Sequence, residues 1–155
     1  MYEVPTYQTK LVRDSSTLKT PVEKLETPTD VWRLAREYTR ETDREHMLCF
    51  WLSTDLRVIG MQEVARGGAH GLGVTPRDIL RGAIVGGAVA IVLAHNHPSG
   101  NPKPSKEDLH MTKLVADACD VVGISLLDHI VVTERDGWRS CTAAMATPDH
   151  SSERD

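Results

Sequence analysis

The sequence predicts a single α/β domain with a mixed central sheet flanked by helices. Patterns typical of helices alternate with patterns typical of strands along the chain, and one strand pattern is continuously apolar. The length of 155 residues suits one ordinary domain with one core. Hydrophobic residues make up 40% and charged residues 26%, close to the averages for soluble globular domains, which argues against disordered, collagen-like and coiled-coil chains.

The first half of the chain predicts an arm, a helix and a hairpin. Residues 1–28 carry three prolines and few large apolar groups, so we expect an extended arm. Thr29 or Asp30 can cap a helix that ends near Glu41, because apolar residues recur there at helical spacing. From His46 onward, an apolar run, the turn at 54–55 and a second run predict two antiparallel strands.

The second half predicts two more helices, each followed or preceded by a strand. Pro76 starts a helix with Thr75 as its cap, and a glycine pair stops it. The run AVAIVLA at 88–94 suits a strand that is buried on both faces. Ser105 fits the cap of a third helix, and ISLLDHIVVT at 124–133 is the last clear strand. We place the domain at 29–141 and expect a disordered tail at 142–155.

Composition and charge exclude several classes of protein. Three widely spaced cysteines without a C-x-x-C pair argue against a disulfide framework or a cysteine-built zinc site. The longest apolar stretch, 83–94, is far shorter than the roughly 20 residues that span a bilayer. The N-terminus lacks the pattern of a signal peptide, so we expect a cytoplasmic protein. The net charge of -4 does not favour nucleic-acid binding, and nothing indicates the oligomeric state.

Side chains that can bind a metal follow the buried strand. His95 and His97 are two residues apart, so a strand directs both to one face, while Asn96 points the other way. Asp108 opens the next helix, and the stiff loop of three prolines can bring it back toward the histidines. Two imidazoles and one carboxylate with an open fourth position are typical of catalytic zinc.

Each of these residues also has an ordinary structural explanation. A His-x-His pair occurs by chance at strand ends. An acidic residue such as Asp108 in the first turn of a helix is common capping chemistry. The proline loop that joins the pair to Asp108 favours the metal site over these explanations.

The string HNHPSGNPKPSKED resembles the JAMM metallopeptidase signature, which is His-x-His, then seven residues that begin with Pro, then Ser-x-x-Asp, in the form of the bacterial RadC family. The stretches REHM at 44–47, TPRDIL at 75–80 and LLDHIVV at 126–132 also resemble RadC proteins. The resemblance covers roughly residues 29–141. It implies a RadC-like JAMM (MPN-type) domain, whose α/β fold is similar to that of cytidine deaminases.

The resemblance also implies roles for particular residues. His95, His97 and Asp108 would bind one Zn²⁺ per chain, with a water at the fourth position. Ser105 would hydrogen-bond that water or the oxyanion formed on attack, beside its capping role. The family also has an upstream glutamate as general base at the start of the first core strand, where this sequence has Glu45.

Glu45 is therefore our candidate for the base that takes a proton from the attacking water and passes it to the leaving amine. Its structural alternative is a surface glutamate that pairs with Arg44 or Arg40. Glu63 is the second choice for the base.

Other residues attract attention without a firm role. His110 lies on a different helix face from Asp108, so we expect it to be exposed. The pair Asp128-His129 could orient a metal-bound imidazole, or it could be a buried or turn-forming pair. The three tryptophans are expected to fill the core, and the glycine-rich stretch 67–73 lacks the features of a phosphate-binding loop and is expected near the site.

The function that these observations favour is zinc-dependent hydrolysis of an amide or isopeptide bond in a peptide or protein, conjugates included. RadC proteins usually carry a helix-hairpin-helix segment before this domain, and only a short arm stands there, which argues against direct DNA binding. The site is peptidase-like and not nuclease-like, so we do not predict DNA repair from it. One alternative is a non-catalytic RadC-like binding module associated with DNA repair or mobile-element proteins. A two-histidine iron oxygenase shares the ligand set. A zinc deaminase requires H-x-E and P-C-x-x-C motifs, and neither appears.

Overall fold

Helices and strands follow one another in the predicted order, with one additional strand and one additional helix at the end. The computed structural model describes residues 1–15, 18–67, 73–135 and 137–146. Its elements are α1 (Pro28–Tyr38), β1 (His46–Leu52), β2 (Val58–Arg66), α2 (Pro76–Val85), β3 (Ala90–Asn96), α3 (Lys106–Val122), β4 (Ser125–Val132), β5 (Trp138–Ser140) and α4 (Cys141–Ala146).

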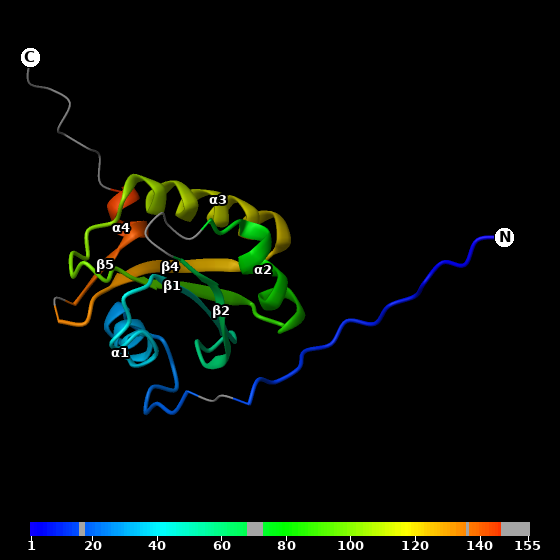
Figure 1. Cartoon of the computed structure of the whole chain (residues 1–155), viewed down its shortest axis with the longest axis horizontal. Helices are drawn as coiled ribbons and strands as arrows, with labels where there is room; N and C mark the ends of the chain where they lie inside the picture. Colours follow the sequence, from blue (N-terminus) through cyan, green and yellow to red (C-terminus); the bar gives the residue numbers. More distant parts are fainter. Residues whose placement is uncertain (16–17, 68–72, 136, 147–155) are drawn as a thin grey trace, which may run out of the picture.

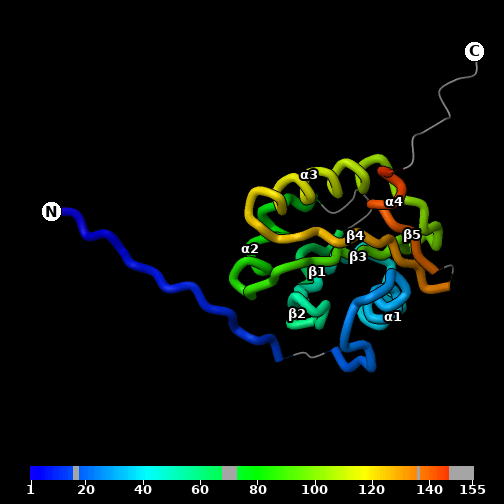
Figure 2. Tube along the Cα trace, turned by 180° about the vertical axis from the view of Figure 1, so that it is seen from behind, coloured from blue at the N-terminus to red at the C-terminus, as the bar shows by residue number. Residues whose placement is uncertain are grey.

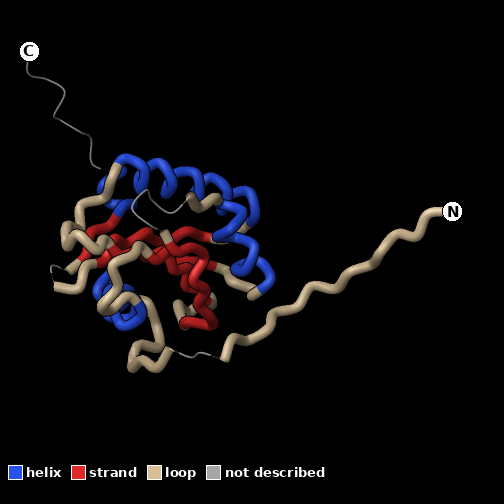
Figure 3. The backbone as a smooth tube through the Cα atoms, in the orientation of Figure 1, coloured by secondary structure: helices blue, strands red, loops and turns tan. Residues whose placement is uncertain are grey.

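The five strands form one mixed sheet in the order β2-β1-β3-β4-β5. β3 and β4 are parallel, and the other neighbouring strands are antiparallel. α2 and α3 cover one face of the sheet and α1 covers the other, as Figures 1 and 3 show. The predicted α/β architecture with a mixed sheet between helices is therefore confirmed.

The central strand β3 divides its side chains between two cores. All seven of its residues are buried, as the continuous apolar run predicts. Ile91 and Leu93 pack on the side of α2 and α3, whereas Val92 and Ala94 pack on the side of α1. Burial of each large side chain stabilises the fold by roughly 1.5–3 kcal/mol. Because side chains alternate along a strand, His95 follows Ile91 and Leu93 onto the side of α3.

α1, α2 and α3 all begin with a capping box, in which a hydroxyl residue and an aspartate three positions later satisfy each other's backbone N–H groups. The cap of α2 at Thr75 is the predicted one. The cap of α1 differs, because Thr27 is the cap and neither Thr29 nor Asp30 is. Pro28 takes the first helical position, where its fixed backbone angle is favourable, so Asp30 stands third in the helix.

The N-terminal arm is shorter than the sequence predicts. Residues 1–15 form no helix or strand and extend away from the domain, as Figure 2 shows. Leu18, Val22 and Leu25, however, pack against the core on the side of α1. The structured part therefore begins about ten residues before the expected boundary at residue 29, because these spaced apolar side chains find a place on the sheet.

The end of the chain also differs from the expectation of a tail from residue 142. β5 adds an edge strand beside β4, and Cys141–Ala146 form α4, with Cys141 fully buried. Ser140 Oγ accepts a hydrogen bond of 2.9 Å from the Ala143 N–H and helps to start this helix. Residues 147–155 lie outside the described residues.

The three cysteines are buried and free. Burial raises the pKa of Cys49 and Cys141 to about 12 and that of Cys119 to about 11, so all three are protonated thiols at neutral pH. Within the described ranges, no helix combines the length and apolar character needed to cross a bilayer.

Candidate metal centre

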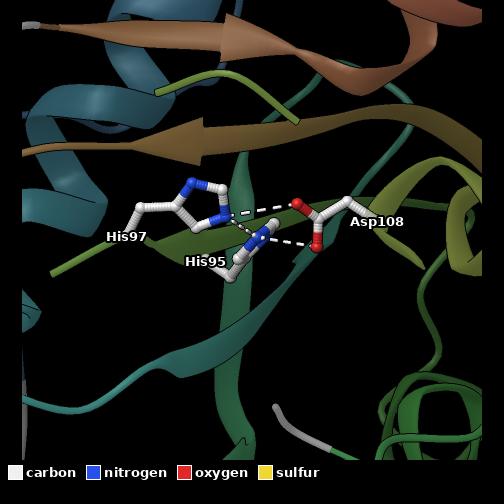
Figure 4. Close-up of side chains that lie close together, drawn as sticks. All are labelled: His95, His97 and Asp108. Carbon is white, nitrogen blue, oxygen red and sulfur yellow. Dashed lines mark hydrogen bonds and ion pairs between the residues drawn. The ribbon is translucent and has the colours of Figure 1, made fainter. Parts of the chain in front are cut away.

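Three potential metal ligands converge where β3 ends and α3 begins. The Nε2 atoms of His95 and His97 lie 3.0 Å apart. Asp108 Oδ1 lies 3.1 Å from His95 Nε2, and Asp108 Oδ2 lies 3.2 Å from His97 Nε2. Figure 4 shows the two rings and the carboxylate directed toward one point. The proline loop thus brings together the residues that the sequence predicts as ligands.

The distance between the two nitrogens, and the distance of each from its nearer carboxylate oxygen, are close to those between neighbouring ligand atoms of a zinc ion. Zinc-to-nitrogen and zinc-to-oxygen bonds of about 2.0–2.1 Å place neighbouring ligand atoms roughly 3.3 Å apart. The chemistry of the donors fits as well. His97 Nδ1 lies 2.8 Å from the Asn101 carbonyl oxygen, which can only accept, so Nδ1 donates and a neutral His97 presents the lone pair of Nε2 to Asp108 and His95. Such a cluster of acceptors suits a cation.

One side of the centre is sealed and the other is open. The side chain of His95 is 0% exposed, whereas those of His97 and Asp108 are 13% and 17% exposed. Burial favours a raised pKa for Asp108, but the imidazoles of His95 and His97 and the Ser105 N–H outweigh it, so this pKa lies well below the usual range. Burial likewise favours a lowered pKa for His97, but Asp108 and the Asn101 carbonyl raise it. Asp108 is therefore a carboxylate that is accessible from solvent.

Asp108 belongs to the capping box of α3 as well as to the cluster. Its Oδ2 accepts from the Ser105 N–H at 2.8 Å, and Ser105 Oγ accepts from the Asp108 N–H at 3.0 Å. In α1 and α2 the hydroxyls of Thr27 and Thr75 also donate to the aspartates of their boxes, at 2.9 and 2.8 Å. The described residues contain no acceptor for the Ser105 hydroxyl, whose hydrogen is available to a ligand.

Glu45 lies immediately before β1, beside the cluster. The antiparallel pairing of β1 with β3 ends with Met47 opposite His95, two residues after Glu45 in the chain. Glu45 is half-buried, and its negative charge contributes to the raised pKa of His97. The alternative of an ion pair with a neighbouring arginine is absent among the described side chains, where Arg40 pairs with Glu37 at 2.6 Å.

Asn96 holds the backbone on both sides of Glu45. Its Oδ1 accepts from the His46 N–H at 2.7 Å, and its Nδ2 donates to the Arg44 carbonyl at 2.8 Å. The sequence indicates only that Asn96 faces away from the two histidines. It does not indicate that the start of β1 lies on that side. There the buried Asn96 amide joins the segment of Glu45 to the strand of the candidate ligands.

Replacing Asn96 by alanine is therefore expected to loosen the segment around residue 45 without removing a metal ligand. The His46 N–H would lose its acceptor, and an unpaired buried donor costs about 1–3 kcal/mol. Hydrogen exchange of the His46 amide should become at least about tenfold faster, while zinc binding should change little. Unchanged exchange of that amide would contradict this role of Asn96.

Glu63, the second choice for the base, contacts side chains outside the ligand cluster. It accepts hydrogen bonds from the Tyr38 hydroxyl at 2.6 Å and from Arg66 Nε at 2.8 Å, and its Oε2 lies 3.3 Å from His46 Nδ1. Burial alone would raise the pKa of Glu63, but these partners lower it. None of the three partners is a candidate metal ligand.

Behind the cluster, His129 of the Asp128-His129 pair contacts the candidate ligand His95, and Asp128 does not. His129 is fully buried, and its Nε2 lies 2.8 Å from His95 Nδ1. Asp128 instead accepts from the His129 N–H and from the Ser140 hydroxyl, each at 2.7 Å. Burial, reinforced by the neighbouring His95, lowers the pKa of His129 well below its ordinary value. Its contact with Thr112, 2.7 Å from Nδ1, is not foreseen from the sequence.

The remaining candidate residues either have structural roles or lie outside the described residues. His110 is exposed, as expected. Trp51 is buried, and Trp32 and Trp138 are packed against the core, so the tryptophans serve packing. Most of the glycine-rich stretch expected near the site, residues 68–72, lies outside the described residues.

Comparison with known proteins agrees with the predicted family and fold. Residues 25–145 match the family model of the RadC-like JAB domain. The chain is 43% identical over 107 residues to a UPF0758 protein of Carboxydothermus hydrogenoformans, covering 69% of this chain and 47% of the relative. It is 40% identical over 105 residues to a UPF0758 protein of Desulforamulus reducens, covering 68% and 46%.

A UPF0758 protein of Alkaliphilus oremlandii is 38% identical over 120 residues, which cover 77% of this chain and 52% of that protein. The chain thus spans about half the length of the curated relatives that it matches. The family model, by contrast, covers most of the chain, including every residue of the ligand cluster. The chain therefore belongs to the RadC-like JAB domain family.

Proposed function

We propose that this protein is a zinc-dependent hydrolase of the JAMM type that cleaves an amide or isopeptide bond in a peptide or protein. The observation that carries this proposal is the convergence of three groups: His95 Nε2 and His97 Nε2 lie 3.0 Å apart, and each lies 3.1 or 3.2 Å from its own oxygen of the Asp108 carboxylate. Two imidazoles and one carboxylate leave a fourth position free, which is the ligand set of catalytic zinc sites.

The zinc ion held by the three ligands and the carboxylate of Glu45 would have different roles in the reaction. A bound zinc ion would supply Lewis-acid chemistry, because it lowers the pKa of water toward about 7 and polarises a carbonyl. Glu45 would take the proton of the attacking water and deliver it to the leaving amine. The nearness of its negative charge to His97 and its partial burial support this role.

Ser105 is proposed to donate to the oxygen that becomes negatively charged when the carbonyl is attacked. The unused hydrogen of its hydroxyl supports this role, because the matching hydroxyls of Thr27 and Thr75 are already used inside their own caps. A donor that is fixed before the reaction stabilises the developing charge without reorganisation. The capping box of α3 holds the Ser105 side chain in place before the reaction.

The proposed substrate is a peptide or protein, including an isopeptide conjugate, which must approach from the side where His97 and Asp108 are partly exposed. We place the reaction in the cytoplasm, where free cysteines such as the three found here remain reduced. The proposal does not depend on a positively charged surface, and we do not include nucleic acid among the proposed partners.

The direct test is to incubate the zinc-loaded protein with a peptide library and with a set of lysine-linked isopeptide conjugates. Mass spectrometry would detect newly formed amines. Cleavage should require zinc, stop with a chelator and return when zinc is restored. If the zinc-loaded protein cleaves no member of either set, the hydrolase proposal fails and a binding module with a structural metal is the better interpretation.

Replacing Ser105 by alanine should reduce cleavage about 100-fold, as loss of an oxyanion donor does in other hydrolases. The variant also loses its helix cap, at about 0.5–2 kcal/mol. Thr75→Ala is the matched control, because it removes the equivalent cap of α2 and should lower stability by a similar amount with normal cleavage. Ser105→Thr keeps a hydroxyl and should retain most activity. Equal loss of activity in the Ser105 and Thr75 alanine variants would point to stability alone.

A further inference from the structure

A chain of buried hydrogen bonds runs behind the cluster from Asp108 to His95. Thr112 Oγ donates to the Asp108 carbonyl oxygen at 2.6 Å. Thr112 Oγ also lies 2.7 Å from His129 Nδ1, and His129 Nε2 lies 2.8 Å from His95 Nδ1. Thr112, His129 and His95 are each no more than 1% exposed, so water does not compete for these bonds. The chain therefore connects the backbone of one ligand with the ring of another.

The direction of each bond follows from its first member. A backbone carbonyl can only accept, so the single hydroxyl hydrogen of Thr112 is used in the bond to Asp108. Thr112 Oγ must then accept from His129 Nδ1. A neutral His129 that donates through Nδ1 has a lone pair on Nε2, and it accepts there from His95 Nδ1. His95 is left with its lone pair on Nε2, the atom that faces Asp108 and His97.

We propose that Thr112 and His129 are positioning residues that hold His95 in the tautomer able to bind a metal. The inference rests on the metal site of the proposed function, but it does not depend on the reaction or the substrate. It assigns a function to two polar side chains that are buried, although burying a polar group in a hydrophobic core costs free energy unless the group is hydrogen-bonded.

The arrangement also makes two ligands depend on each other. Thr112 lies one helical turn after Asp108, so its hydroxyl can reach the carbonyl of the residue that supplies the carboxylate. His129 lies on β4 next to β3, within reach of the ring of His95. The acceptor behind a metal-bound histidine is usually a carboxylate, a carbonyl or a water. Here it is a second imidazole, which adds no negative charge to the site.

Substitution of Thr112 separates this proposal from simple packing. Thr112→Val keeps the shape of the side chain but removes the acceptor of His129 Nδ1–H. The ring of His129 can then protonate at Nε2, which forces His95 Nδ1 to accept and places a hydrogen on His95 Nε2. We expect zinc affinity, measured by competition with a chromophoric chelator, to fall about 10- to 100-fold. Thr112→Ser restores the hydroxyl and should bind zinc within about threefold of the wild type.

Nitrogen NMR of the zinc-loaded protein gives a second and direct readout, because zinc then occupies the space between the Nε2 atoms and the carboxylate. With ¹⁵N-labelled histidine, long-range correlation spectra distinguish rings protonated at Nδ1 from rings protonated at Nε2. His95 and His129 should both be protonated at Nδ1 in the wild type and in Thr112→Ser. Protonation of either ring at Nε2 in the wild type would overturn the proposal, and this holds even where Thr112→Val does not fold.

The zinc measurement can overturn the proposal separately. If folded Thr112→Val binds zinc as tightly as the wild type, or if Thr112→Ser loses as much affinity as Thr112→Val, the hydroxyl does not position His95. If the wild type binds no zinc, the positioning role fails together with the metal site. If zinc binds and the tautomers are as expected but no substrate is cleaved, the hydrolase proposal fails and the positioning role stands.

Discussion

Replacing Asp108 by asparagine should weaken zinc binding by roughly 10²–10³-fold. Structural zinc sites bind with about 10–16 kcal/mol, so one ligand of four accounts for roughly 3–4 kcal/mol. Asparagine keeps the size of the side chain and can still accept from the Ser105 N–H, so the helix cap is largely preserved. Elemental analysis should find about one zinc per chain in the wild type, and chelator competition would measure the affinity of the variant.

The fold contains a matched control for this experiment. Asp78 occupies the same third position in the capping box of α2, accepts from the Thr75 N–H at 2.9 Å, and has no histidine beside it among the described residues. Asp78→Asn should therefore leave zinc binding unchanged while it perturbs its helix to a similar degree. His110→Ala is a second control, since His110 is exposed on α3. Zinc binding by Asp108→Asn at the affinity of the wild type would remove Asp108 from the ligand set.

Replacing Glu45 by glutamine should abolish most hydrolysis and leave zinc in place. A general base contributes roughly 10²–10⁴-fold to such reactions, and an amide in its position can neither take nor return a proton. Glu45 is not among the atoms that converge on the metal position, so the zinc content should stay near that of the wild type. The measurements are the cleavage rate under zinc-loaded conditions and the zinc-to-protein ratio of the same sample.

Glu107→Gln serves as the control for removal of a negative charge near the site. Glu107 is exposed in the first turn of α3, next to Asp108 in the sequence, and should tolerate the change with normal cleavage. If Glu45→Gln keeps zinc and also keeps the cleavage rate of the wild type, the base lies elsewhere. Loss of zinc in Glu45→Gln would instead show that residue 45 supports the metal position and not the proton transfer.

The ligand cluster could be predicted because each of its parts has a local cause. Alternation along a buried strand directs His95 and His97 to one face, and the capping pattern of Ser105 with Asp108 places the carboxylate at a helix start. The resemblance to RadC proteins joined the two. Confirmation of the helix at Thr75 and of the hairpin has the same basis, since caps and apolar patterns are properties of short segments.

The supporting residues could not be predicted because their partners are distant in the sequence. Asn96 bonds to residues 50 and 52 positions earlier, and His129 bonds to a ring 34 positions earlier. No local pattern specifies which strand lies beside β3 or which turn of α3 faces β4. The boundary errors have another cause, because Leu18 packs against the core and α4 forms beside β5 only once the sheet offers them a surface.

The pairing of β1 with β3 has a consequence for how the protein folds. Its six residue pairs run without a shift in register, whereas β1 with β2 and β3 with β4 contain irregularities. A slip of β3 by one residue would turn both histidines toward α1 and the intervening asparagine toward α3. Zinc would then find no site, so its binding energy would be added to the native register alone. Zinc binding would thus favour the native alignment of β1 with β3 over competing alignments. Chains with mispaired strands would not retain zinc.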